Sequence, residues 1–88
     1  MAERAVTVVN ELGLHARPAA EFVKLASVYQ SHIQLSKDGD TVNGKSIMGV
    51  MTLAAECGAQ LIVQAEGPDA EAAVIALEEL VANGFGVQ

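Results

Sequence analysis

The order of strand-like and helix-like segments constrains the fold of this chain more than any other feature of its sequence. Residues 4–9 (RAVTVV) are rich in β-branched side chains and predict a strand. From Ala16 to about Val28, apolar residues recur every three or four positions, which indicates an amphipathic helix. The complete order is strand, helix, strand, strand, helix, strand, helix, with no internal repeat or linker. For 88 residues this order predicts a single α+β domain, residues 1–88, with one hydrophobic core.

Pro18 fixes the point at which the first helix begins. Proline has no backbone N–H and is tolerated only in the first turn of a helix, where that group has no intrahelical partner. The helix must therefore begin within a residue or two of His15. Its predicted apolar face consists of Ala19, Phe22, Val23 and Ala26.

The middle of the chain predicts a β-hairpin followed by a short helix. Residues 32–36 (HIQLS) alternate apolar and polar side chains, "KDGD" supplies an Asp-Gly turn, and residues 40–43 (DTVN) form the second arm. Ser46 is placed to act as the N-cap of the short helix. The apolar face of that helix is formed by Ile47, Val50, Met51 and Ala54.

The last third of the chain predicts one more strand and one more helix. A turn at Gly58 leads into a strand through residues 61–63. Residues 68–84 (PDAEAAVIALEELVANG) then predict a helix with Asp69 as its N-cap and Gly84 as its stop.

Composition and charge exclude several classes of partner. The chain carries 5 Lys and Arg residues against 11 Asp and Glu, a formal net charge of −6, so it lacks the basic stripe that direct nucleic-acid binding requires. Aromatic residues make up 3%, which also disfavours an RNA-binding domain of similar element order, because such domains stack bases on aromatic rings. The single cysteine, Cys57, excludes an internal disulfide and fits a reducing compartment. Because no segment has the apolar length of a signal peptide or a membrane span, we expect a cytoplasmic protein without membrane insertion.

The segment "GLHARPAA", residues 13–20, raises the question of what His15 does. It is a candidate N-cap, a candidate metal ligand and a candidate for chemistry. His15, His32 and Cys57 show no recognisable metal-ligand spacing, so we expect no metal site and interpret Cys57 as a structural thiol.

Chemistry at His15 is favoured by its place at a helix N-terminus. The free amides and the positive dipole end disfavour imidazolium and attract an anion. A neutral imidazole is a nucleophile, and a phosphoryl group on its nitrogen would be met by those amides and by the guanidinium of Arg17.

The segment around Ser46 offers a second candidate site. Ser46 can be a helix cap and a phosphorylation site at the same time. The short helix after it cannot bury both faces, so we expect Met51 to turn inward and Met48 outward. Ile47, Met48 and Met51 are the candidate partner-docking residues of this helix.

Two motifs carry a resemblance to a known family. "GLHARPAAEFV" and "VNGKSIMGVMTLA" closely resemble the two signature regions of HPr, the histidine-containing phosphocarrier family of the bacterial phosphoenolpyruvate-dependent sugar phosphotransferase system. The resemblance covers essentially the whole chain. It implies an open-faced β-sandwich, in which a four-stranded antiparallel sheet of order 1-4-2-3 is covered on one face by three helices.

The resemblance also implies roles for individual residues. His15 matches the histidine that takes a phosphoryl group on Nδ1 from phospho-enzyme I and gives it to enzyme IIA domains of sugar permeases. Arg17 matches the arginine that accompanies it, and Ser46 matches a regulatory serine. In some bacteria HPr kinase/phosphorylase modifies that serine, and the product acts with a catabolite-control transcription factor. A monomeric carrier without cofactor or independent turnover is implied.

Two other functions remain as alternatives. They are a regulatory relative in the nitrogen-related phosphotransferase branch and a small α+β interaction domain without chemistry. Relatives that serve only as co-regulators replace the active histidine, so His15 argues against that role. Leu12 departs from the small polar residue that many members carry before the glycine, which affects fine tuning of the site.

Overall fold

A computed structural model describes residues 1–86 and contains the seven predicted strands and helices in the predicted order. It adds one short 3-10 turn at the C-terminal end, where the sequence offered no pattern. The strands are β1 (Ala2–Thr7), β2 (His32–Lys37), β3 (Asp40–Asn43) and β4 (Gln60–Glu66), and the helices are α1 (Ala16–Ala26), α2 (Ile47–Thr52), α3 (Ala70–Ala82) and the 3-10 turn η1 (Gly84–Gly86).

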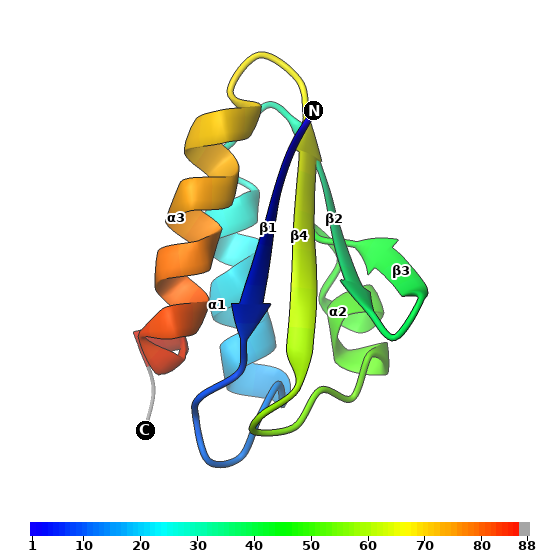
Figure 1. The fold of residues 1–88 in the computed structure, drawn as a ribbon, viewed down its shortest axis with the longest axis vertical. Helices are drawn as coiled ribbons and strands as arrows, with labels where there is room; N and C mark the ends of the chain where they lie inside the picture. The colour runs from blue at the N-terminus through cyan, green and yellow to red at the C-terminus, as the bar shows by residue number, and fades with distance from the viewer. Residues whose placement is uncertain (87–88) are drawn as a thin grey trace.

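The four strands form one antiparallel sheet in the order β1-β4-β2-β3, with the three α-helices on one of its faces (Figure 1). Burial alternates along β4, where Leu61, Val63 and Ala65 are buried and their neighbours are exposed or half-buried. Alternation of this kind is expected when one face of a sheet is packed and the other meets water. The predicted α+β fold with strand order 1-4-2-3 is confirmed.

Small and aliphatic side chains fill the core between sheet and helices. Phe22 from α1 and Phe85 from η1 are its largest members, and both are fully buried. Helix α1 buries Ala19, Phe22 and Ala26 of its predicted apolar face, whereas Val23 is only partly buried. The helix ends two residues before the predicted Val28, which is 71% exposed.

The turn between β2 and β3 is the predicted Asp-Gly hairpin turn. Asp38 and Gly39 both have positive φ, 51° and 88°, as a two-residue hairpin turn requires. At the other end of the chain, Gly84 has a φ of 67° and directly follows the C-cap of α3, as predicted for the residue that stops this helix.

Asp69 corrects one prediction. It occupies the N-cap position of α3, but its side chain makes no capping hydrogen bond. Its carboxylate instead accepts hydrogen bonds from the backbone N–H groups of Gln30 and Ser31, both at 2.9 Å, and from the Ser31 hydroxyl. The residue therefore ties the β4–α3 connection to the loop before β2, a tertiary role that local capping rules do not anticipate.

These bonds predict an acid-dependent loss of stability. The Ser31 hydroxyl and the Gln30 amide lower the pKa of Asp69 in the folded protein, because both donate to its charged form. The stabilisation is therefore present above the ordinary pKa of an aspartate, about 3.9, and is lost as the pH falls through the lowered value in the folded protein. We expect urea denaturation to show a smaller fall in the free energy of unfolding between about pH 5 and pH 2 for Asp69→Asn than for the wild type.

The matched control for this experiment is Asp38→Asn. It changes an exposed carboxylate of the hairpin turn, for which no such set of hydrogen bonds exists. Its stability should follow the pH curve of the wild type. Equal curves for Asp69→Asn and the wild type would show that another group causes the acid dependence.

Candidate functional site

His15 is the N-cap residue of α1, with φ −92° and ψ −166°. Its carbonyl accepts the first helical hydrogen bond, from the N–H of Ala19 at 2.9 Å, but its side chain makes no capping hydrogen bond. The predicted helix start is therefore correct, and of the candidate roles for His15 the structure supports the N-cap position but not capping by the ring. The amides of the first turn, at Ala16 and Arg17, have no intrahelical acceptor and remain available to an anion.

The two ring nitrogens of His15 lie in different surroundings. Nε2 is fully shielded from solvent and has no hydrogen-bond partner in the described part of the chain. Nδ1 likewise makes no hydrogen bond in the described residues, yet it is not among the buried atoms that lack a partner, so it is the nitrogen that solvent or an incoming group can reach. An attack by this ring on an external electrophile would therefore use the lone pair of Nδ1.

The segment between α2 and β4, residues 53–59, supports the loop that carries His15. The N–H of Leu14 donates to the carbonyl of Ala55 at 2.7 Å. Gly13 has a φ of 72°, and a Cβ at this position would lie 2.5 Å from that same carbonyl oxygen. In Figure 1 the two segments run side by side below the sheet. Glycine is therefore required here both for its backbone conformation and for the close approach.

Arg17 lies in the first turn of α1 and is exposed. Within residues 1–86 its side chain makes no hydrogen bond and no salt bridge, and the first turn contains no acidic residue. A cation at a helix N-terminus opposes the dipole, at a cost of about 0.3–1 kcal/mol. A guanidinium kept there without a protein partner is available to an anion that also meets the free amides.

Ser46 caps α2 as predicted. Its side chain accepts a hydrogen bond from the N–H of Gly49 at 3.1 Å. A Cβ at Gly49 would lie 3.3 Å from the Ser46 hydroxyl, so the glycine leaves space around this group. The ammonium of the neighbouring Lys45 donates to the carbonyl of Tyr29 at 2.6 Å and is thus engaged away from the serine.

The outer surface of α2 is apolar. Ile47, Met48 and Met51 are 44%, 76% and 39% exposed, and we call these three residues the α2 patch. The prediction that Met51 turns inward is wrong, because a helix of six residues packs too narrow a face and buries Val50 alone. The prediction for Met48 is correct.

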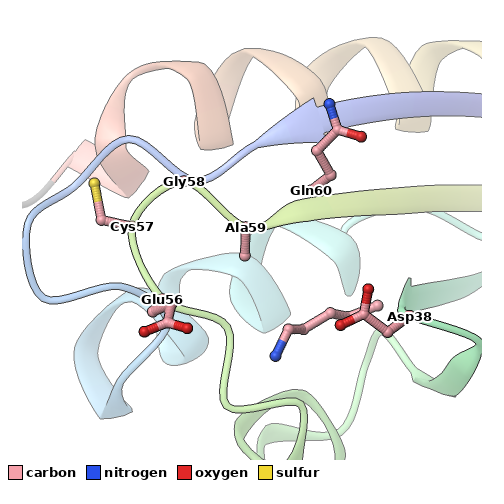
Figure 2. Close-up of a pocket in the computed structure, with 7 residues that line it drawn as sticks. Asp38, Glu56, Cys57, Gly58, Ala59 and Gln60 are labelled. Atoms are coloured by element: carbon pink, nitrogen blue, oxygen red, sulfur yellow. The ribbon is translucent and has the colours of Figure 1, made fainter.

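A polar hollow of about 370 Å³ lies beside the 53–59 segment (Figure 2). It includes none of His15, Arg17 or Ser46. Cys57, interpreted from the sequence as a structural thiol, is exposed at one end of the hollow, and its thiol donates to the carbonyl of Val9 at 3.7 Å. The lining residues are Lys37, Asp38, Glu56, Cys57, Gly58, Ala59 and Gln60.

Two further features concern metals and membranes. In the part of the chain that the structure describes, no three His, Cys, Asp or Glu side chains are grouped so that they could hold a metal ion. Over the same residues, no helix has both the length and the apolar character needed to cross a membrane.

Comparison with known protein families identifies the chain. Residues 2–83 match the family model described as the PTS HPr component phosphorylation site. The chain belongs to the HPr family. It is therefore a phosphocarrier protein of the phosphotransferase system.

Individual HPr proteins match along almost their whole length. The phosphocarrier protein HPr of Treponema pallidum is 51% identical over 85 residues, which cover 97% of each chain. That of Cupriavidus necator is 45% identical over 86 residues, covering 98% of this chain and 97% of the relative. Among solved structures, an HPr from Thermoanaerobacter tengcongensis superposes with a TM-score of 0.94 at 45% identity, covering 100% of this chain and 99% of that one.

Proposed function

We propose that His15 is the residue on which this HPr protein carries its phosphoryl group, at Nδ1. The observation that carries the proposal is the contrast between the ring nitrogens, because Nε2 is shielded and Nδ1 can be reached. The available amides of the first turn of α1 and the unpaired guanidinium of Arg17 lie at the same helix end. Both favour the negative charge of a phosphoryl group.

The transfer proceeds by nucleophilic attack. The lone pair of Nδ1 attacks phosphorus on phospho-enzyme I while the ring proton stays on Nε2. A new N–P bond forms, the bond from phosphorus to the donor breaks, and its electron pair remains on the donor. In the second transfer a nucleophile of an enzyme IIA domain attacks the phosphorus, a bond to that nucleophile forms, the N–P bond breaks, and its electron pair returns to Nδ1.

The proposal extends to the setting in which the carrier acts. We propose that the chain is one phosphocarrier domain, residues 1–88, which acts as a monomer in the cytoplasm on the sugar branch of the system. Enzyme I and enzyme IIA domains are the partners that membership of the HPr family implies. The α2 patch of Ile47, Met48 and Met51 is the proposed docking surface for both, since it is exposed and apolar.

We also propose that Ser46 is a regulatory phosphorylation site. Its support is a half-buried hydroxyl that caps α2 next to the α2 patch, with the space left by Gly49 above it. Added phosphate would place charge at the edge of the docking surface without removing a core side chain. HPr kinase/phosphorylase and a catabolite-control transcription factor are the proposed partners of this form.

The direct test of the proposed function is incubation with phosphoenolpyruvate and enzyme I. The wild-type protein should gain one phosphate that is lost in acid and kept in base, as a phosphohistidine is. Passage of that phosphate to an enzyme IIA domain completes the test. A protein that takes up no phosphate under these conditions would contradict the proposal.

Arg17 gives a further prediction. Arg17→Ala should slow phosphoryl transfer both from enzyme I and to enzyme IIA by about fivefold, or about 1 kcal/mol, because a charge-assisted contact to the phosphoryl group is lost. Its free energy of unfolding should stay the same or rise by up to about 1 kcal/mol, since the side chain is exposed and its charge opposes the helix dipole. Quenched samples taken at fixed times from both transfer reactions, together with thermal melts, measure these effects.

Lys24→Ala is the matched control for Arg17→Ala. It removes an exposed cation from the last turn of the same helix, away from His15. Its transfer rates should equal those of the wild type. If the two variants behave alike, Arg17 acts only through net charge.

A further inference from the structure

Asn10 is a buried amide side chain in the loop that leads to His15. It is 8% exposed, and in the described residues Ser31 is the other buried polar residue. Burial of an amide is unfavourable unless its polar atoms are hydrogen-bonded. The bonds that Asn10 makes therefore indicate why it is there.

The hydrogen bonds of Asn10 join it to Gly13. The Asn10 side chain donates from Nδ2 to the Gly13 carbonyl at 2.6 Å, and the Asn10 carbonyl accepts from the Gly13 N–H at 3.1 Å. The Gly13 carbonyl also accepts from the N–H of His15 at 3.1 Å. The Asn10 side chain and the His15 backbone thus meet at one oxygen atom.

The oxygen of the Asn10 amide also indicates that the side chain acts through its bond to Gly13. Oδ1 of Asn10 is buried and has no partner in the described part of the chain. An unpaired buried acceptor destabilises the fold. The contribution of this side chain is therefore made through Nδ2 alone, at the Gly13 carbonyl.

The backbone of Gly13 also lies close against the 53–59 segment. The backbone on that side is close enough that a Cβ at Gly13 would lie 2.5 Å from the Ala55 carbonyl oxygen and 2.8 Å from the Glu56 Cα. The next residue, Leu14, is hydrogen-bonded to the same carbonyl. Gly13 is thus in contact with both Asn10 and the 53–59 segment, and loss of the Asn10 side-chain bond would remove one of these restraints.

We infer that Asn10 is a positioning residue for phosphoryl transfer, acting on His15 through the shared Gly13 carbonyl. The inference rests on the proposed function of His15. By fixing the His15 backbone, the Asn10 bond fixes the point from which the ring extends. That point determines which nitrogen is shielded and which can reach the phosphoryl donor.

The test compares Asn10→Ala and Asn10→Asp with the wild type as substrates of enzyme I. Alanine removes the donor, and aspartate keeps the shape but presents a second acceptor to the Gly13 carbonyl. We expect kcat to fall about fivefold, because small errors in the position of a reacting group are costly. KM should stay within about twofold, since the α2 patch is untouched. The ¹⁵N resonances of the His15 ring should shift in both variants.

Ser31→Ala is the matched control. It removes the other buried polar side chain, which bonds to Asp69 on the connection before α3. It should lower stability while leaving kcat and the His15 ring resonances as in the wild type. If Ser31→Ala changes them as the Asn10 variants do, the effect comes from general loss of stability and the inference is wrong.

The remaining outcomes are also decisive. Folded Asn10 variants with the kcat and ring resonances of the wild type would overturn the inference and leave the proposed function intact. If Asn10→Ala does not fold, Asn10→Asp is judged by the same criteria. If neither folds, Asn10 acts on the whole fold and not on His15, and the inference fails. A wild type that accepts no phosphate from enzyme I would instead contradict the proposed function itself.

Discussion

His15→Ala should take up no phosphate from phosphoenolpyruvate and enzyme I, while its fold and stability stay close to those of the wild type. The loss should be complete because alanine offers no nucleophile. Stability should be little changed, because the half-buried ring makes no capping bond and its Nε2 is buried without a partner. Acid-labile, base-stable labelling measured beside circular dichroism melts gives both quantities.

His32→Ala is the control that separates the site from histidine content. His32 is the other histidine of the chain and is exposed on β2, where it pairs with Glu66 of β4. This variant should be labelled as fully as the wild type. Undiminished labelling of His15→Ala would place the phosphoryl group on another residue and would overturn the central assignment.

The elements of the fold could be predicted because local rules and tertiary packing agree in most of this chain. Pro18 restricts the start of α1 to the neighbourhood of His15, and the structure has His15 as the N-cap. The Asp38-Gly39 pair specifies a hairpin turn, which both residues form with positive φ. In each case a backbone requirement is visible in one or two residues, so the sequence contains enough information.

What could not be predicted depends on contacts between distant segments. Ala54 and Phe85 have positive φ although neither is a glycine, so no local signal marks the 53–59 segment or the buried Phe85. The hydrogen bond from the N–H of Leu14 to the carbonyl of Ala55 joins the loop after β1 to the segment before β4, which are far apart in the sequence. Asp69 has the sequence context of a helix cap, yet its carboxylate is used by Gln30 and Ser31.

The candidate site shows the same division. His15 and Arg17 could be selected from the sequence because they are two residues apart at a predicted helix start. The shielding of Nε2 and the bonds between Asn10 and Gly13 depend on how the loop packs, which no motif reports. The inward position predicted for Met51 is wrong because the elements packed against a six-residue helix decide which of its faces is buried.

Ser46→Asp should reduce the rate at which enzyme I phosphorylates His15 by about tenfold at low salt, through slower association. The reason is charge at the rim of the docking surface: the α2 patch begins at the next residue, and Lys45 is engaged with Tyr29 and does not neutralise the added carboxylate. The fold should be retained, because aspartate is as good an N-cap as serine. True phosphoserine, with a charge of about −1.5 to −2, should have a larger effect of the same sign.

Two controls isolate the charge in this experiment. Ser46→Asn keeps the cap and nearly the shape of aspartate without its charge, so it should be phosphorylated at the rate of the wild type. Ser46→Ala removes the cap, at a cost of about 1 kcal/mol of stability, and should also leave the rate unchanged. The rates are measured for all four proteins at low salt and at about 0.5 M salt, where the shorter Debye length should bring Ser46→Asp close to Ser46→Asn. If Ser46→Asp and Ser46→Asn are phosphorylated equally fast at low salt, where screening is weakest, the proposed inhibition by charge is wrong. Ser46 then acts as a helix cap alone.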